Sequence, residues 1–236
     1  MDGKGTVKIA LKNALFEVEF RCHFNNPDDA YQVLPFMRSC LHRQVAWNGT
    51  FYGLELFQSG RVLRITDVVV GEDTQCYIGW KEPDTGKFAN IRQEIVEDIT
   101  TGIADSTILS FLGGRERIQN KNEAIQELER LGYNRFMSWT GTDFTGYYKP
   151  HDINVKLMSC AMLRWPFLVE IEKMATTEEE ASQFEKDLYE LSRQLKLERR
   201  LVKEEPPTQL YTTVFGGKDR GDGGLLSESG NIDEQQ

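Results

Sequence analysis

Two short acidic segments, far apart in the chain, carry the residues best suited to chemistry. Glu17 and Glu19 lie in a Phe-Glu-Val-Glu-Phe-Arg segment near the N-terminus, and Glu170 and Glu172 lie in a Phe-Leu-Val-Glu-Ile-Glu segment near the C-terminus. Side chains alternate between the two faces of a strand, so both glutamates of each segment project from one face and apolar residues from the other. These carboxylates either face water on a surface strand or line the interior of a closed sheet, where they would need cations.

Isolated basic residues stand on other strand-like segments, each flanked by apolar residues. They are Arg64, Lys81, Arg92 and Lys156. Arg21 follows the first acidic segment, and Glu94 shares a strand face with Arg92. If these strands enclose one interior, the carboxylates would hold Mg²⁺ or Mn²⁺, which prefer oxygen ligands, and the basic groups would hold phosphate oxygens. A metal ion and basic side chains around phosphates are the usual equipment of phosphoryl transfer.

The elements that position these residues follow from hydrophobic periodicity and turn residues. Alternation predicts strands over 6–24, 50–57, 61–70, 75–82, 88–98, 134–140, 143–149, 152–160 and 167–173. Helical spacing predicts helices over 27–38, 122–131 and 178–199, the last beginning at a capping box, Thr177-x-x-Glu180. Because each acidic segment precedes a helix, we expect an α+β fold, a closed antiparallel barrel of about eight strands flanked by helices. Residues 1–202 would form this domain and 203–236 a largely disordered tail.

Composition narrows the possible functions. The chain has 236 residues and a formal net charge of -9, which argues against an extended nucleic-acid-binding surface. Its four cysteines are widely spaced, which favours buried reduced thiols over a zinc site. We find no signal segment and no apolar run long enough to span a bilayer. We therefore expect a cytoplasmic protein without a membrane partner, as a monomer or homodimer.

At these residues the chain resembles the CYTH superfamily, also called triphosphate tunnel metalloenzymes. That superfamily includes thiamine triphosphatases, inorganic tripolyphosphatases, class IV adenylyl cyclases and fungal-type RNA triphosphatases. Its E-x-E-x-K motif is similar to Glu17-x-Glu19-x-Arg21, and its terminal E-I-E strand to Glu170-Ile171-Glu172. Three more of its strands are similar to Leu63-Arg64, Tyr77 to Lys81 and Arg92-x-Glu94.

The resemblance implies a metal-dependent phosphohydrolase acting on a nucleoside, thiamine or inorganic triphosphate. It implies a site for Mg²⁺ or Mn²⁺ made of Glu17, Glu19, Glu94, Glu170 and Glu172. It implies substrate binding through Arg21, Arg64, Lys81, Arg92 and Lys156. Glu17, Glu19 and Lys81 would carry catalysis, by electrostatics and positioning.

The chain departs from the family pattern at three places. Thr66 replaces the second arginine of L-R-x-R, residues 136–140 lack the K-x-R pair, and Cys160 stands where an aspartate is expected. Three alternatives therefore stay open: class IV adenylyl cyclase-like activity, a non-catalytic nucleotide or polyphosphate binder on the same fold, and a β-rich interaction module with no cavity. We interpret Trp139 and Trp165 as core residues rather than base-stacking platforms.

Overall fold

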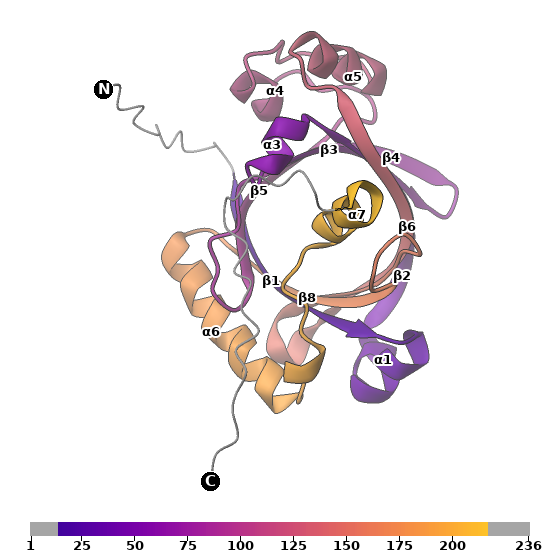
Figure 1. Cartoon of the computed structure of the whole chain (residues 1–236), viewed down its shortest axis with the longest axis vertical. Coiled ribbons are helices and arrows are strands. Elements are labelled where there is room, and N and C mark those ends of the chain that lie inside the picture. The colour runs from indigo at the N-terminus through magenta and orange to yellow at the C-terminus, as the bar shows by residue number, and fades with distance from the viewer. Residues whose placement is uncertain (1–13, 217–236) are drawn as a thin grey trace.

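Eight antiparallel strands close into one barrel, as the sequence predicts. The computed structural model describes residues 14–216, and Figure 1 views the barrel along its axis. Around the barrel the strands follow the order β1-β5-β4-β3-β2-β6-β7-β8. Their bounds are Leu15–Phe24 (β1), Leu41–Tyr52 (β2), Val62–Val70 (β3), Asp73–Lys81 (β4), Asn90–Asp98 (β5), Arg135–Tyr148 (β6), Ile153–Ser159 (β7) and Phe167–Ala175 (β8).

Two strand predictions differ from the structure in the middle of the chain. The strand expected over 50–57 is wrong, because β2 begins at Leu41 and the chain enters helix α3 at Leu54. Gly53 makes this turn with a φ of 71°, a conformation that favours glycine. The two strands expected between 134 and 149 are the single long strand β6.

Within residues 14–216, seven α-helices lie around and across the barrel. Their bounds are Pro27–Val33 (α1), Met37–Cys40 (α2), Leu54–Gln58 (α3), Thr107–Phe111 (α4), Lys121–Arg130 (α5), Glu178–Gln194 (α6) and Pro206–Phe215 (α7). The single helix expected over 27–38 is divided into α1 and α2, with Pro35 between them. The predicted capping box is present, since the Thr177 side chain accepts a hydrogen bond from the Glu180 backbone N–H at the start of α6.

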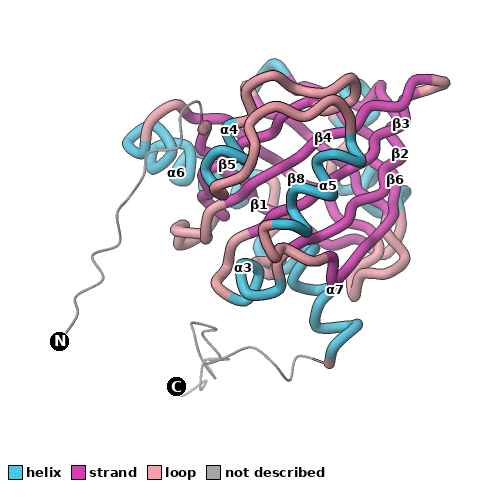
Figure 2. Tube along the Cα trace, turned by 90° about the horizontal axis from the view of Figure 1, so that it is seen from above, coloured by secondary structure: helices cyan, strands magenta, loops and turns pink. Residues whose placement is uncertain are grey.

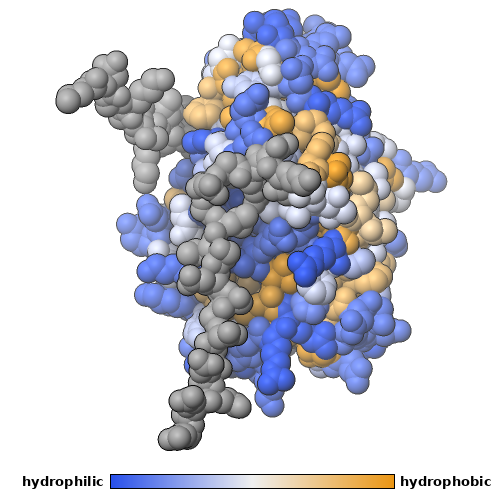
Figure 3. Space-filling view, viewed as in Figure 1, coloured by the Kyte–Doolittle hydropathy of each residue, from blue (hydrophilic) through white to orange (hydrophobic). Residues whose placement is uncertain are grey.

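Helix α6 decides which face of the acidic strands is inside. Val18 on β1 and Ile171 on β8 pack in one apolar cluster with Leu188 and Leu191 of α6. Burial of apolar surface stabilises the fold by roughly 25 cal/mol per Å². The outward side of α6 is hydrophilic (Figure 3). The apolar faces of β1 and β8 therefore point outward beneath α6, and their glutamates point into the barrel.

Helix α7 lies across one mouth of the barrel (Figures 1 and 2). Leu210 and Tyr211 are buried in an apolar cluster with barrel residues, and the Tyr211 ring centroid lies 5.2 Å from that of Phe57. Residues 203–216 therefore pack with the barrel, which corrects the expected boundary at 202, because these apolar side chains bury surface there. Residues 217–236, for which disorder is predicted, lie outside the described residues. Within the described residues, no helix combines the length and apolar character needed to cross a bilayer.

Candidate functional site

The barrel encloses a cavity of about 210 Å³ with a strongly charged wall. Seven residues singled out from the sequence line it: Glu17, Glu19, Arg21, Arg64, Lys81, Lys156 and Glu170. Strand register brings them together, since β1 pairs with both β5 and β8. In that register Arg21 lies opposite Glu170, and Glu19 lies opposite Glu172. The alternative of a β-rich module without a cavity is therefore wrong.

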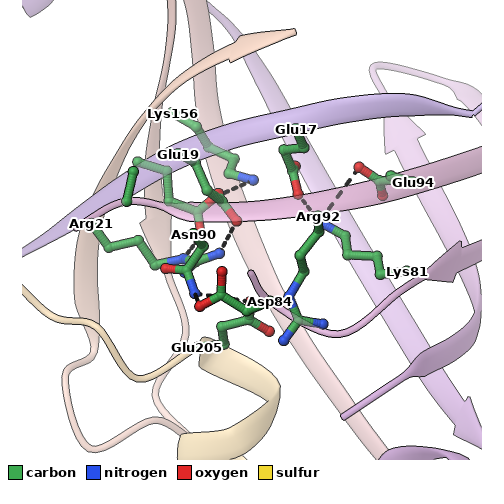
Figure 4. A network of polar contacts seen from close by, with 12 residues as sticks. Glu17, Glu19, Arg21, Lys81, Asp84, Asn90, Arg92, Glu94, Lys156 and Glu205 are labelled. Atoms are coloured by element: carbon green, nitrogen blue, oxygen red, sulfur yellow. Dashed lines mark hydrogen bonds and ion pairs between the residues drawn. The ribbon is translucent and has the colours of Figure 1, made fainter. Parts of the chain in front are cut away.

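Lys81 holds Glu17 in its ionised form. The Lys81 ammonium pairs with Glu17 Oε2 and lies 3.4 Å from Glu94 Oε2 (Figure 4). Burial alone would raise the pKa of Glu17, but the positive charge and hydrogen bond of Lys81 lower it to about 2. Glu17 is therefore a carboxylate at neutral pH, adjacent to an ammonium group.

Arg21 connects the two acidic segments. Its Nε donates to Glu170 Oε1 at 2.8 Å, its Nη1 donates to Asn90 Oδ1 at 3.1 Å, and its Nη2 pairs with Glu19. Lys156 pairs with the other oxygen of Glu170. Burial opposes ionisation of Glu170, but Lys156 and Arg21 outweigh it and hold its pKa well below the ordinary value.

Three of the five predicted metal ligands converge. Glu17, Glu19 and Glu172 each offer a carboxylate oxygen, and these oxygens lie within 4.8 Å of one another. Burial raises the pKa of Glu19 well above its usual range, and burial together with the charge of Glu17 raises that of Glu172 to about 7. Glu17 is ionised and its two neighbours resist ionisation, and crowded carboxylate oxygens of this kind are the donor set that a hard divalent cation satisfies, so such a cation fits this place.

The other two predicted ligands lie nearby but are engaged elsewhere. Glu170 is held by Arg21 and Lys156, as described above. Glu94 lies beside Lys81 and is 3.7 Å from Arg64 Nη2, and burial together with the charge of Glu17 raises its pKa. Glu170 and Glu94 therefore lie outside the three-carboxylate cluster, in which Glu17 and Glu19 are also paired with basic residues.

Arg92 is placed differently from the other basic residues. Its Nε lies 2.5 Å from Oε1 of Glu205, the N-cap residue of α7, and its Nη1 donates at 3.2 Å to the backbone oxygens of Gly60 and Glu82. Asn90 also donates to Glu205 at 3.3 Å. Figure 4 shows this group at the end of the barrel where α7 enters. Arg92 is therefore paired with other groups of the protein and is not among the residues lining the cavity, whereas its partner Glu205 is.

Several cavity residues were not found from the sequence. Asp143 on β6, Trp47 on β2 and Glu205 before α7 line the cavity. Trp139 also lines it, and its interpretation as a core residue is confirmed, because it is buried in an apolar cluster. For Asp143, the sequence offers the alternation of side chains along its strand as a signal, and this indicates a strand but not a cavity position. Cys160, where the family aspartate was expected, instead packs in an apolar cluster.

No family model and no curated protein matches this sequence. Several solved structures are similar to it. The PH1819 protein of Pyrococcus horikoshii OT3 aligns with a TM-score of 0.63 at 16% identity, covering 82% of this chain and 97% of that one. A proposed adenylate cyclase from Vibrio parahaemolyticus aligns with a TM-score of 0.57 at 16% identity, covering 83% and 97%.

A third solved structure is named for an activity. HpAC1 from Hippeastrum, a proposed adenylyl cyclase described as having a dominant triphosphatase activity, aligns with a TM-score of 0.53 at 13% identity, covering 86% of this chain and 96% of that one. At such identities the likenesses establish the fold. The chain therefore shares its overall fold with these solved structures.

Proposed function

We propose that this protein is a metal-dependent phosphohydrolase acting on a triphosphate-containing small molecule inside the barrel. The observation that carries the proposal is the shared cavity, where Glu17 and Glu19 lie with Lys81 and Arg21. Glu172 offers a third carboxylate oxygen within 4.8 Å of those of Glu17 and Glu19. A polyphosphate chain is the small-molecule group whose many oxygens suit both a divalent cation and several basic side chains at once.

In this proposal the basic residues of the cavity hold the phosphate oxygens. They are Arg21, Arg64, Lys81 and Lys156. When bound at Glu17, Glu19 and Glu172, Mg²⁺ or Mn²⁺ would withdraw charge from the phosphates and make the scissile phosphorus more electrophilic. Glu17, Glu19 and Arg21 are buried, and burial strengthens each of these electrostatic contacts.

The reaction is transfer of the terminal phosphoryl group to water. A bond forms between the water oxygen and the phosphorus, and the bond to the bridging oxygen breaks. No side-chain nucleophile is needed, because positioning and electrostatic stabilisation supply most catalysis in phosphoryl transfer. Lys81 would neutralise charge that develops on the phosphates, and Glu17 and Glu19 would hold the metal.

Internal ion pairs favour a second candidate, a non-catalytic binder of nucleotides or polyphosphate. Lys81 is paired with Glu17, Arg21 with Glu170, and Arg92 with Glu205. A substrate must compete with these carboxylates, and Thr66 offers no guanidinium in the cavity. A cyclase would use the same residues and attack phosphorus with a ribose hydroxyl.

Phosphate release tests the proposal. Purified protein is incubated with tripolyphosphate, ATP or thiamine triphosphate, with Mg²⁺, Mn²⁺ or a chelator. We expect metal-dependent release of phosphate that falls at least about a hundredfold in Glu17→Gln and Lys81→Met, while the exposed control Glu72→Gln keeps full activity. Metal-dependent binding without turnover of any of the three would establish the binder instead, and cyclic nucleotide formation would establish the cyclase.

A further inference from the structure

The side chain of Asn90, the first residue of β5, joins the charged cavity wall to residues outside it. Its Oδ1 accepts a hydrogen bond from Arg21 Nη1 at 3.1 Å, and its Nδ2 donates to Asp84 Oδ2 at 2.9 Å and to Glu205 Oε1 at 3.3 Å (Figure 4). Asn90 is only 3% exposed. Arg21 and Glu205 line the cavity, whereas Asn90 and Asp84 are not among its lining residues. Asn90 therefore contacts residues of the site without lining it.

The three partners of Asn90 allow a single orientation of its amide. The oxygen and the nitrogen of an asparagine amide exchange places when the group turns over, and the hydrogen-bond network decides which arrangement holds. A guanidinium group donates hydrogen bonds and does not accept them, whereas a carboxylate accepts them. A reversed amide would place its N–H groups against Arg21 and its oxygen against Asp84 and Glu205. The two carboxylates therefore keep the Asn90 acceptor directed at Arg21.

The loop between β4 and β5 holds Asp84 in place. Asp84 Oδ1 accepts hydrogen bonds from the backbone N–H groups of Gly86 and Ile91, both at 2.9 Å. Glu185 of α6 accepts hydrogen bonds from the backbone N–H groups of residues 87–89, at 2.7, 2.7 and 3.2 Å. The loop is thus bonded both to itself and to α6, and Asp84 directs its other oxygen to Asn90.

Asn90 differs in charge from the other partners of Arg21. Glu19 and Glu170 are carboxylates, whereas the Asn90 amide is neutral. Contacts with these residues use three of the five N–H groups of the guanidinium, so the group has two further donors for phosphate oxygens. A third carboxylate at this place would offset more of the positive charge and would repel an anionic substrate. A neutral acceptor fixes the orientation of the guanidinium and leaves its charge for the ligand.

We propose that Asn90, oriented by Asp84, is a positioning residue that holds the Arg21 guanidinium in place for the phosphate groups of the substrate. The inference rests on the proposed function and adds to it two residues that act on the substrate through Arg21. Fixing the guanidinium in advance lowers the conformational entropy that is lost when a phosphate group binds. Loss of the Asn90 acceptor should therefore weaken substrate binding, with a small effect on the rate of the bound complex.

Two variants test this role, with tripolyphosphate in Mg²⁺ as the ligand. Asn90→Leu removes the acceptor with little change of shape, and we expect Kd in calorimetry and KM for phosphate release to rise about tenfold while kcat changes by less than about threefold. Asp84→Asn places an amide where a carboxylate accepts from Asn90, and it should raise Kd and KM by about threefold. Lys203→Met is the control, because it removes the ion pair at 3.1 Å to Asp84 Oδ2 and leaves the hydrogen bond between Asp84 and Asn90. This control should keep Kd and KM within about twofold of the wild-type values.

A double-mutant cycle separates the positioning of Arg21 from a general loss of structure. If Asn90 acts through Arg21, Asn90→Leu should raise Kd by less than about threefold in an Arg21→Lys background, because the lysine ammonium has no guanidinium fork to orient. An equal rise in both backgrounds, or no rise in the wild-type background, would overturn the inference. A rise in Lys203→Met as large as that in Asp84→Asn would overturn the role of Asp84.

The behaviour of wild-type protein keeps this inference apart from the proposed function. If wild type binds tripolyphosphate and both Asn90→Leu and Asp84→Asn bind it equally well, the positioning role is wrong and the proposed function stands. Failure of wild type to bind tripolyphosphate, ATP and thiamine triphosphate in Mg²⁺ or Mn²⁺ would overturn both. Thermal melting of each variant checks that it is folded, and Asp84→Asn replaces Asn90→Leu in the cycle if the leucine variant does not fold.

Discussion

Replacing Glu172 by glutamine should stabilise the metal-free protein at neutral and alkaline pH. Burial and the neighbouring charge of Glu17 raise the pKa of Glu172 from its ordinary value of 4.5 to about 7. The folded state thus prefers the protonated carboxyl more than the unfolded state does. Stability is greatest below pH 4.5, falls as the pH rises toward 7, and is then constant with respect to this group.

The size of the effect follows from the pKa difference between the folded and unfolded states. Each pKa unit corresponds to 1.36 kcal/mol, which gives an upper bound of about 3 kcal/mol, and partial exposure of Glu172 reduces the expected gain to about 2 kcal/mol. For a chain of this length, that gain raises Tm by about 4–8 °C. The amide retains the acceptor for Asn154, whose Nδ2 donates to Glu172 Oε1 at 3.3 Å.

Thermal melting from pH 5 to pH 9, in chelator and in Mg²⁺ or Mn²⁺, is the assay. In chelator, the difference in Tm between Glu172→Gln and wild type should appear between pH 5 and 7 and persist above it. The divalent cation should raise the Tm of wild type more than that of the variant, because it neutralises a charge that the variant lacks. Glu72→Gln, at an exposed turn, is the control.

A difference in Tm that is independent of pH would refute the electrostatic reasoning. Equal metal stabilisation of wild type and Glu172→Gln would show that Glu172 is not part of the cation site. A lower Tm for the variant in chelator at pH 8 would show that the carboxylate is compensated in the folded protein.

Three further predictions concern the end of the barrel that α7 covers and the packing of the buried aromatic residues. Glu205→Gln should tighten tripolyphosphate binding by about fivefold in calorimetry, because it frees Arg92 and removes a negative charge from the cavity wall; unchanged affinity would contradict this. Gly141→Ala should destabilise the fold by about 1–3 kcal/mol in urea unfolding, since its Cβ would lie 2.4 Å from the Trp47 ring. Tyr211→Ala should cost about 3–5 kcal/mol in the same assay, whereas a loss below 1 kcal/mol would mean that α7 packs loosely.

The fold was largely predictable because its elements follow local patterns. Alternating residues mark most strands, and the capping box at Thr177 marks the start of α6. The misplaced elements are those whose length depends on distant partners. Strand β2 extends back to Leu41 because it pairs with β6, and β6 continues through Gly141 because Trp47 covers that glycine from the neighbouring strand.

The charged half of the site was predictable in part. Spacing at i and i+2 places Glu17 with Glu19, and Glu170 with Glu172, on one face of each strand, and the barrel brings both pairs inside. The separate roles were not predictable. Glu170 is taken by basic partners while Glu172 joins the three-carboxylate cluster, although the two belong to one segment. Only the positions of neighbouring strands distinguish them.

The sequence by itself determined the strands, their two unlike faces and the presence of carboxylates and basic groups on the same faces. These properties are local, because they depend on the two-residue period of a strand. Tertiary structure decided which face is buried inside, since α6 covers the apolar faces of β1 and β8. It also brought Asp143, Trp47 and Glu205 to the cavity from distant segments, and the pairings that place them depend on the closure of the barrel rather than on any local pattern.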